Sequence, residues 1–466
     1  MLDISKIIRN QRDKIFLKHK DKIYTYGDLE NRISLICNEL SRYSIKEIAF
    51  VGDRDFDHFA FVISCIILNI PVYIFYPTWP ENKIKEQLNN CNIADIVFGK
   101  QIYNETKNYS CNEYVIDDGY IVKKNEMPDV RNNKDSQEFR IYLSTSGTTG
   151  DNKWNCYKIE TILDNMRVLA NQLSISEKDC LHIVLPLYTS NGITISFFLP
   201  FSQGASIFLD DELTIYNINQ YIYKGYINDV TVVSLVPSIV RILNRVNMDE
   251  CNLKKTKVRF SICGTSALHV SDSKKFEEKY GFPIYLNYGL TETLFVSSQN
   301  ETFHSDNSSG GLLKGVIVEI DNNMIKIKSP YFSDNLTQND SYENGYFTSG
   351  DLGKIVNNEL HVEGRNKEQI IKNGYNINPN EIKNIIAKYN GINDCFVFGY
   401  PDKLMGEEVI CAVVTNDMYD ENELMKYMNK NIPKYMRPKI LKIDRLPTND
   451  TGKVLKSELL NLLNTK

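Results

Sequence analysis

Short apolar runs alternate with helical patterns through the first two thirds of the chain. Early runs occupy residues 48–51, 72–75 and 96–98, and later ones occupy residues 181–187, 205–209, 230–235, 258–263 and 284–287. Such alternation predicts parallel strands joined by helices. Several runs end in a turn carrying Gly, Ser, Thr or Asn, at the edge of an open α/β sheet where ligands bind. A longer apolar run, residues 59–68, is interpreted as a buried helix.

The pattern changes near residue 325. Short alternating strands with Asn-, Asp- and Gly-rich turns then predict a small antiparallel or barrel-like element. After Gly364 comes a mixed helix and strand pattern of about a hundred residues, the size of a small domain. We therefore expect an α/β protein with a large N-terminal domain, residues 1–366, of mixed, mostly parallel sheets flanked by helices. Residues 367–466 should form a small α+β C-terminal domain.

Composition and charge narrow the class of protein. Of 466 residues, 42% are hydrophobic and 24% charged, as in an ordinary globular protein, and two domains are expected at this length. A net charge of -5 argues against nucleic acid as the main partner. No apolar run reaches the roughly 20 residues of a transmembrane helix, and residues 1–20 lack a signal-peptide core, so we expect a cytoplasmic protein. The ten cysteines include no C-x-x-C pair, which favours reduced structural thiols over zinc ligands.

Residues 142–153 carry the most informative chemistry. They read Tyr-Leu-Ser-Thr-Ser-Gly-Thr-Thr-Gly-Asp-Asn-Lys. Glycines let backbone N–H groups approach phosphate oxygens, hydroxyls add donors, and a lysine adds charge. The spacing is not that of a Walker A loop. On this segment alone, a flexible surface loop rich in Ser and Thr explains the sequence nearly as well.

Four further segments follow this loop in a fixed order. Residues 287–292 read Asn-Tyr-Gly-Leu-Thr-Glu, and residues 346–352 read Tyr-Phe-Thr-Ser-Gly-Asp-Leu. Residues 364–382 contain Gly-Arg-Asn-Lys and Lys-Asn-Gly-Tyr, and residues 446–456 contain Thr-Gly-Lys. With the loop, these segments resemble the motifs of the adenylate-forming superfamily, which includes acyl-CoA synthetases, firefly luciferase and nonribosomal adenylation domains. The resemblance begins at residues 24–29 and spans nearly the whole chain.

The resemblance implies ATP-dependent activation of a carboxylic acid to an acyl adenylate, with release of pyrophosphate. The acyl group then passes to the thiol of coenzyme A or of a phosphopantetheine arm on an acyl or peptidyl carrier protein. Mg²⁺ would be held by Glu292, Thr291 would bond the α-phosphate, and Lys453 would bind both the carboxylate and the α-phosphate. The remaining nucleotide-binding residues implied are Thr145, Ser146, Gly147, Thr148, Thr149, Gly150, Lys153, Gly264, Thr265, Ser266, Asn287, Tyr288, Gly289, Asp351 and Arg365.

Individual roles follow from the same resemblance. Tyr288 would stack on adenine, Asp351 would accept both ribose hydroxyls, and Arg365 would reach the ribose or a phosphate. In the family the small domain is mobile and rotates about a hinge, here Lys367. The rotation withdraws the catalytic lysine and opens a thiol channel, here near Gly374.

Two positions depart from the family pattern. The phosphate loop usually continues Pro-Lys-Gly, whereas this chain has Asn152 and Trp154 around the retained lysine. We expect ATP binding to persist, with altered kinetics or a weakened enzyme as open alternatives.

Substrate choice is addressed by residues 185–193, which resemble the Pro-Leu-Tyr-His-x-x-Gly segment of acyl-CoA synthetases with Thr189 at the usual His. Tyr188, Asn191 and Gly192 are candidate acyl-pocket residues, or simply core residues. No acidic residue lies between Leu181 and Ser206 to pair a substrate ammonium, which favours a fatty or aryl acid. A freestanding amino-acid adenylation enzyme is the second hypothesis. A catalytically silent nucleotide-binding relative is the third.

Overall fold

The computed structural model describes residues 4–105, 107–125, 138–146, 152–211, 213, 218–221, 224–225, 228–246, 256–265, 268, 270–338, 341–365, 369–447 and 454–464. Its contacts divide the chain into two compact units. Unit 1 comprises Met1–Pro77, Asn92–Ser144 and Trp154–Asn366, and unit 2 comprises Thr78–Cys91, Thr145–Lys153 and Lys367–Lys466. None of the described helices is both long and apolar enough to cross a membrane.

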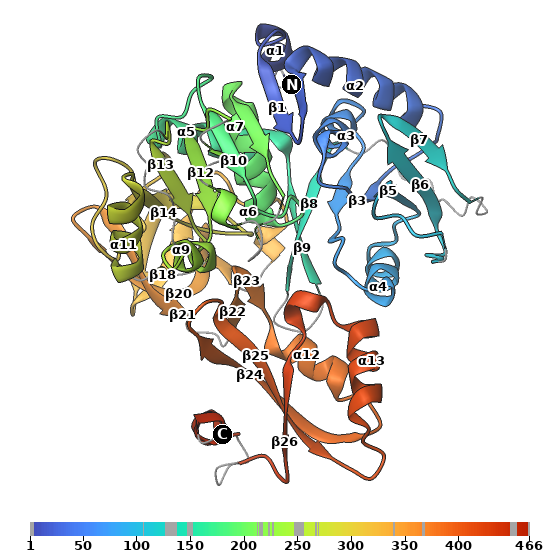
Figure 1. The fold of residues 1–466 in the computed structure, drawn as a ribbon, viewed down its shortest axis with the longest axis vertical. Coiled ribbons are helices and arrows are strands. Elements are labelled where there is room, and N and C mark those ends of the chain that lie inside the picture. Colours follow the sequence, from blue (N-terminus) through green and yellow to red (C-terminus); the bar gives the residue numbers. More distant parts are fainter. Residues whose placement is uncertain are drawn as a thin grey trace. The chain divides into compact units, whose positions relative to one another are not determined.

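The first sheet has the strand order β7-β6-β5-β3-β4-β8-β9 (Figure 1). Strands β3, β4, β5, β6 and β8 run parallel, whereas β7 returns antiparallel to β6. The apolar helix α3 (Phe56–Ile67) is buried along almost its whole length, as the run at residues 59–68 predicts. The strand bounds are β3 Ile48–Val51, β4 Val72–Ile74, β5 Asp95–Gly99, β6 Asn112–Asp117, β7 Tyr120–Lys123, β8 Ile141–Ser146 and β9 Asn152–Tyr157.

The second sheet begins with a parallel part. Strands β1 (Ile15–His19), β11 (Ser206–Leu209), β10 (Cys180–Ile183), β12 (Val232–Leu235), β13 (Phe260–Cys263) and β14 (Ile284–Leu290) lie side by side in this order. The hairpin strand β2 (Lys22–Thr25) closes one edge. All four residues of β10, β12 and β13 are buried, which explains their continuous apolar runs.

From β14 onward the same sheet is antiparallel. The strands that follow are β15 (Leu294–Ser298), β16 (Gly311–Leu312), β21 (Glu359–Arg365), β20 (Tyr346–Val356), β18 (Met324–Lys328) and β17 (Ile317–Asp321), with β19 (Tyr342–Glu343) pairing β20. The expected antiparallel element is therefore present. Its described strands extend the sheet and do not close a barrel.

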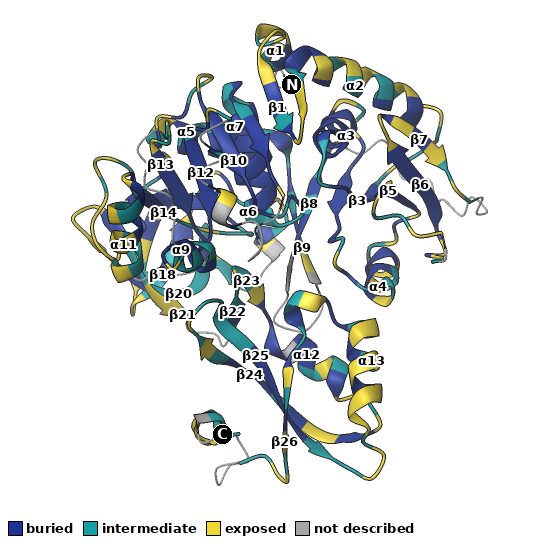
Figure 2. Ribbon diagram, viewed as in Figure 1, coloured by how far each residue is buried: buried dark blue, intermediate teal, exposed yellow. Residues whose placement is uncertain are grey.

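Several helices pack on these sheets through one apolar face. Helix α5 (Ile159–Gln172) buries Ile162, Met166 and Leu169 at helical spacing, and Figure 2 shows exposed outer faces on α2 (Tyr26–Leu40) and α11 (Val270–Tyr280). Helix α2 begins with a capping box in which Thr25 and Asp28 bond each other's backbone N–H groups. The remaining helices of unit 1 include α1 (Ile4–Asn10), α6 (Ser190–Ile193), α7 (Leu199–Gln203) and α9 (Pro237–Leu243).

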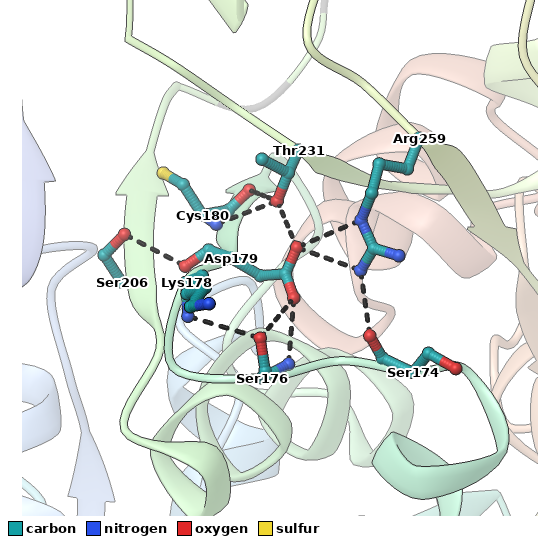
Figure 3. A network of polar contacts seen from close by, with 8 residues as sticks. All are labelled: Ser174, Ser176, Lys178, Asp179, Cys180, Ser206, Thr231 and Arg259. Atoms are coloured by element: carbon teal, nitrogen blue, oxygen red, sulfur yellow. Dashed lines mark hydrogen bonds and ion pairs between the residues drawn. The ribbon is translucent and has the colours of Figure 1, made fainter.

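A polar network ties the amino ends of three parallel strands together (Figure 3). The buried carboxylate of Asp179, just before β10, accepts hydrogen bonds from the Thr231 hydroxyl at 2.7 Å and from Arg259 Nη2 at 2.9 Å. The Ser176 N–H donates to its second oxygen at 2.8 Å. Thr231 and Arg259 precede β12 and β13, so one carboxylate fixes the starts of these strands.

Unit 2 contains a mixed sheet of β23-β22-β25-β24, with β26 parallel to β25. Strands β24 and β25 form a long antiparallel pair, whose Cys395, Val397, Cys411 and Val413 belong to the core of this unit. In the same unit, Lys83 Nζ of α4 lies 3.0 Å from Glu381 Oε1 of α12, both side chains being buried. The bounds are β22 Ile370–Lys372, β23 Tyr375–Ile377, β24 Ile392–Asp402, β25 Gly406–Thr415, β26 Lys439–Ile443, α4 Glu81–Cys91, α12 Pro379–Ile386, α13 Glu421–Asn431 and α14 Lys456–Asn464.

Candidate active site

The candidate site lies where the large sheet changes from parallel to antiparallel. Strand β14 pairs parallel with β13 on one side and antiparallel with β15 on the other. Gly264 follows the carboxyl end of β13, and Asn287 follows the last parallel pair of β14, Cys263 with Leu286. Ligands of open α/β sheets bind at the carboxyl ends of strands, so the fold places two of the predicted segments at such a position.

A hydrogen bond joins two predicted nucleotide-binding residues that are distant in sequence. The Tyr288 hydroxyl donates to Asp351 Oδ2 at 2.7 Å. Asp351 is 2% exposed, and in the ladder between β20 and β21 it lies opposite Arg365. The structure therefore brings the segments at residues 287–292 and 346–352 into one site.

Two glycines at this site allow neighbouring segments of the chain to pack closely against them. A Cβ added at Gly264 would lie 2.1 Å from Asn287 Oδ1, and one added at Gly289 would lie 2.4 Å from the backbone oxygen of Leu294. Next to Gly264, Thr265 has φ of 75°, an uncommon value for a residue other than glycine. A side chain at Gly264 would thus clash with Asn287, and one at Gly289 would clash with the backbone of β15.

Thr291 and Glu292 lie in the tight turn between β14 and β15. The Thr293 N–H donates to the Leu290 carbonyl across the turn at 3.2 Å, and Leu294 has φ of 55°. The Tyr157 hydroxyl donates to the Thr291 carbonyl at 2.5 Å. Burial, and then the nearby Glu292 carboxylate, raise the pKa of Tyr157, so its hydroxyl keeps its proton and remains a donor.

The ends of the candidate phosphate loop are described, but its centre is not. Thr145 and Ser146 end β8, with their side chains outside the description, and Gly147, Thr148, Thr149 and Gly150 lie outside the described residues. Lys153 is exposed in β9. Asn152 begins β9, and its side chain is not described.

The unusual Trp154 has a defined place in this strand. Its ring lies 5.2 Å from that of Tyr73 and 5.4 Å from that of Phe75, measured between centroids. Tyr73 in turn stacks on Tyr142 at 3.9 Å. The tryptophan is therefore an anchor that packs the strand leaving the loop against β4 and its carboxyl end.

The candidate acyl segment forms a short irregular helix. Thr189, at the position where the family usually has His, caps helix α6 by accepting a hydrogen bond from the Gly192 N–H at 3.0 Å. A Cβ at Gly192 would lie 1.8 Å from the Pro186 carbonyl oxygen. One π-helical turn, Thr194–Phe198, follows, a feature frequent at functional sites. Thr189 thus caps the helix and Gly192 allows close packing on Pro186, and both roles are independent of the substrate.

Tyr188 and Asn191 are partly buried, as are Pro186, Thr189 and Ser190 of the same segment. The Tyr188 ring lies 4.9 Å from that of Tyr76, which follows β4. The contact between the two rings links the segment after β4 of the first sheet to the segment after β10 of the second.

The other predicted residues are described in part. Ser266, Lys367 and Lys453 lie outside the described residues, as does the side chain of Arg365. Gly374, with φ of 82°, and Asn373, with φ of 50°, form the two-residue turn between β22 and β23. Such Asn-Gly turns need positive φ at both positions, so Gly374 has a backbone role.

Sequence reasoning missed three residues that contact the Thr291–Glu292 turn or the strand leaving the phosphate loop: Tyr157, Ser333 and Asn335. None belongs to a motif, and each acts on backbone groups far away in the sequence. No sequence signal marks them.

Comparison with known proteins supplies the family context. The AMP-binding enzyme family model matches residues 5–329, and the AMP-binding enzyme C-terminal domain model matches residues 381–453. The chain is 24% identical to the 2-succinylbenzoate–CoA ligase of Staphylococcus aureus (strain JH9), over 94% of either chain.

Two solved structures show the same fold. The o-succinylbenzoate CoA synthetase of Bacillus subtilis, a double mutant bound to its product analogue OSB-NCoA, superposes with a TM-score of 0.83 at 21% identity, over 98% of both chains. The amide bond synthetase of Marinactinospora thermotolerans has a TM-score of 0.82 at 17% identity, over 98% of this chain and 99% of that one.

Proposed function

Because the chain belongs to the AMP-binding enzyme family and is an acid-activating ligase that forms an acyl adenylate, we propose that it activates an aryl carboxylic acid and transfers the acyl group to coenzyme A. The observation that carries this proposal is the Tyr288–Asp351 hydrogen bond. It unites the segments to which adenine and ribose binding are assigned, beside a turn that bears Thr291 and Glu292.

The first half-reaction is substitution at phosphorus. A carboxylate oxygen of the acid attacks the α-phosphorus of ATP, and the bond to the pyrophosphate oxygen breaks as pyrophosphate leaves. Charge must then be stabilised on the phosphorus oxygens and on the leaving group, a task for fixed donors and cations. In the second half-reaction the thiolate of coenzyme A attacks the acyl carbonyl carbon, and AMP leaves.

The residues divide this work by position and chemistry. Tyr288 offers an aromatic face for adenine, and the buried Asp351 offers acceptors for the ribose hydroxyls. Glu292 supplies a carboxylate oxygen of the kind Mg²⁺ prefers, and the bound ion would neutralise triphosphate charge. Thr291 donates to the α-phosphate, while the loop residues Thr145, Ser146 and Lys153 hold the β- and γ-phosphates.

The C-terminal residues complete the proposal. Lys453 is assigned to the carboxylate and α-phosphate during adenylation. Residues 367–466 are assigned to a mobile domain that turns about Lys367, with the thiol channel at Gly374. Arg365, which faces Asp351 in the β20–β21 register, would reach the ribose or a phosphate.

The acid class follows from what surrounds the acyl segment. The paired rings of Tyr188 and Tyr76 favour an aromatic substrate, which can pack on their faces. No carboxylate stands between Leu181 and Ser206 to pair an ammonium group, which disfavours amino acids. The related ligases act on 2-succinylbenzoate, so that aryl acid is the first candidate to test.

The deciding experiment measures pyrophosphate release from MgATP with a panel of acids. The panel contains 2-succinylbenzoate, benzoate, a medium-chain fatty acid and an amino acid, each with and without coenzyme A. We expect release with an aryl acid and an acyl-CoA product detected by mass spectrometry. Release only with the fatty acid or only with the amino acid would contradict the proposed substrate class.

A lysine variant tests the chemistry itself. Lys453→Ala should abolish adenylation and leave thioester formation from a supplied acyl adenylate largely intact. Lys430→Ala, which removes an exposed lysine at the end of α13, is the matched control and should keep both half-reactions. The identity of the acceptor is tested in the wild-type protein. If the acyl adenylate accumulates although coenzyme A is present, the acceptor is a carrier protein or an amine rather than coenzyme A.

A further inference from the structure

The loop at residues 333–335 contacts three segments that are separate in the sequence. Arg140, immediately before β8, forms an ion pair with Asp334, its Nε lying 2.7 Å from Oδ2. The Asp334 N–H donates to the Cys156 carbonyl of β9 at 2.7 Å. The Ser333 N–H donates to the Glu292 carbonyl at 3.0 Å. The loop therefore touches the strands entering and leaving the candidate phosphate loop, and also the candidate magnesium ligand.

Asn335 hydrogen-bonds to the backbone of β9 in the way that a neighbouring β-strand would. Its Nδ2 donates to the Trp154 carbonyl at 2.7 Å, and its Oδ1 accepts from the Cys156 N–H at 3.1 Å. A side-chain amide carries the same donor and acceptor as a peptide group, so one residue satisfies two backbone groups of β9. The Ser333 hydroxyl also bonds the buried Asn155 Oδ1 at 3.2 Å.

The backbone carbonyls of Thr291 and Glu292 each accept a hydrogen bond from a residue outside their turn. The Thr291 carbonyl accepts from the fully buried Tyr157 hydroxyl, and the Glu292 carbonyl accepts from the Ser333 N–H. Both donors are tied to β9, because Tyr157 ends that strand and Ser333 lies beside Asp334 and Asn335. These two carbonyls belong to the peptide planes on either side of Glu292, so fixing them fixes the direction in which the Glu292 side chain leaves the backbone.

We propose that Tyr157 and residues 333–335 are positioning elements, which fix the turn bearing Thr291 and Glu292 relative to residues 154–157 of β9 and so orient the Glu292 carboxylate for the magnesium ion of MgATP. This inference rests on the proposed function of Glu292. It assigns no contact with substrate to Tyr157 or Asn335, which act through Thr291, Glu292 and the backbone of β9.

The test is nucleotide affinity with and without the metal ion. Calorimetric titration of ATP is performed in Mg²⁺ and in EDTA on the wild type, Tyr157→Phe, Asn335→Ala and the double variant. We expect each single variant to bind MgATP about tenfold more weakly, a loss of the size caused by leaving a buried backbone group without its hydrogen-bond partner, and metal-free ATP within about twofold of wild type. Because both residues act on one unit, the losses in the double variant should fall short of additive.

Matched controls separate positioning from a general loss of stability. Tyr280→Phe removes a buried hydroxyl that donates to the Leu243 carbonyl at 2.8 Å, remote from this turn. Asn300→Ala removes an amide that donates to the Gln172 carbonyl at 3.1 Å and accepts from the Phe303 N–H at 2.8 Å. These controls should lower the melting temperature as much as the test variants do and leave MgATP affinity unchanged.

Two outcomes overturn the inference: equal weakening with and without Mg²⁺, or the same weakening in the control variants. The titration needs no acid and no thiol, so its result is independent of which acid is activated. A wild type that binds MgATP but releases no pyrophosphate with any acid would overturn the proposed reaction alone.

Discussion

Tyr288 and Asp351 meet through a 2.7 Å hydrogen bond between the phenol and Oδ2, although 63 residues separate them in the chain. Asp351 is almost completely buried, and a carboxylate removed from water needs donors around it. The Tyr288 phenol supplies one such donor, and it holds the carboxylate with Oδ2 toward the tyrosine and Oδ1 away from it. The adenine and ribose assignments are thereby coupled, since moving either residue moves the other.

This coupling predicts the behaviour of Tyr288→Phe. Phenylalanine keeps the ring for stacking and loses only the donor to Asp351. Hydrogen bonds to charged groups contribute about 1.5–3 kcal/mol, so we expect the KM for ATP to rise about tenfold or more. Fluorescence titration with AMP should show the same loss.

Tyr114→Phe is its matched control. It removes an equivalent bond from a buried tyrosine, whose hydroxyl lies 3.1 Å from Asp95 Oδ1 in the first sheet. That variant should unfold at lower temperature and bind AMP as the wild type does. Equal loss of AMP affinity in both variants would show that the Tyr288 phenol has no special role.

A second prediction concerns Gly289. A methyl group there would approach the Leu294 carbonyl oxygen to 2.4 Å, and a backbone atom cannot move aside as a flexible side chain can. Gly289→Ala must therefore shift β14 against β15 and displace Thr291 and Glu292. We expect pyrophosphate release to fall by more than about tenfold, with destabilisation of about 1–3 kcal/mol typical of overpacking.

Gly225→Ala provides the comparison. A Cβ at Gly225 would meet only ordinary contacts, at 3.6 Å from His182 Nδ1 and 3.8 Å from Val230. Activity should persist in this variant. Retained activity in Gly289→Ala would contradict the close packing of β14 and β15 at this point.

Local hydrophobic patterns predict where the buried strands lie, but they do not give the exact bounds of each strand. The run at residues 48–51 coincides with β3, because a buried strand is apolar throughout. The run at residues 181–187 is longer than its strand, β10, which ends at Ile183. Leu185 and Leu187 are buried in the loop that follows, and hydrophobicity reports burial rather than strand geometry.

In the candidate site, too, some residues are predictable from the sequence and others are not. Asp351 and Tyr288 lie in recognisable motifs, so the sequence predicts them, and the fold brings them together. Tyr157 and Asn335 bond backbone groups that lie 134 and 181 residues away, at Thr291 and Trp154. Every residue type carries a backbone carbonyl, so a hydrogen bond to that carbonyl does not restrict which residue accepts it. The sequence around the accepting residue therefore gives no sign of the bond.

The network around Asp179 yields a prediction about stability alone (Figure 3). Asp179→Ala would remove the carboxylate that accepts from Arg259 and from the Ser176 N–H at the amino ends of β10 and β13, and Arg259 would keep its bond to the Ser174 carbonyl. Asp179 is buried, but the Arg259 side chain is 39% exposed and can be solvated, so we expect a loss of about 2 kcal/mol, which urea denaturation can measure. The KM for ATP should not change, because the candidate site lies at the opposite ends of these strands.

An exposed ion pair near the same sheet edge is the control for Asp179. Lys257 lies 2.6 Å from Asp229, and both side chains are more than 60% exposed. Lys257→Ala should therefore change stability by less than about 1 kcal/mol, and it leaves the left-handed backbone of Asp229 (φ of 57°) untouched. Similar losses in both variants would show that burial does not strengthen the Asp179 network.

The last prediction concerns pH and the N-cap of α3. Asp55 caps this helix by accepting a hydrogen bond from the His58 N–H. Burial, and then the neighbouring charges of Asp57 and Asp53, raise the pKa of Asp55 to about 7. The folded protein therefore holds a proton here that the unfolded chain releases near pH 4. This contribution to stability is complete below pH 4 and is lost as pH rises through 7.

Asp55→Asn keeps a good N-cap and removes the titration, so its effect on stability must depend on pH. Relative to wild type, the variant should be more stable at pH 8 than at pH 5, by about 2–4 kcal/mol for a pKa raised this far. His58 has a pKa lowered by burial to about 4, which destabilises both proteins alike as pH falls from 6.5, and this effect cancels in the comparison. Asp420→Asn makes the same change at the exposed N-cap of α13, where no burial is relieved, and serves as the control. Urea denaturation of the three proteins at both pH values decides the matter, because an equal difference at pH 5 and pH 8 would mean that Asp55 is ionised in the fold at both.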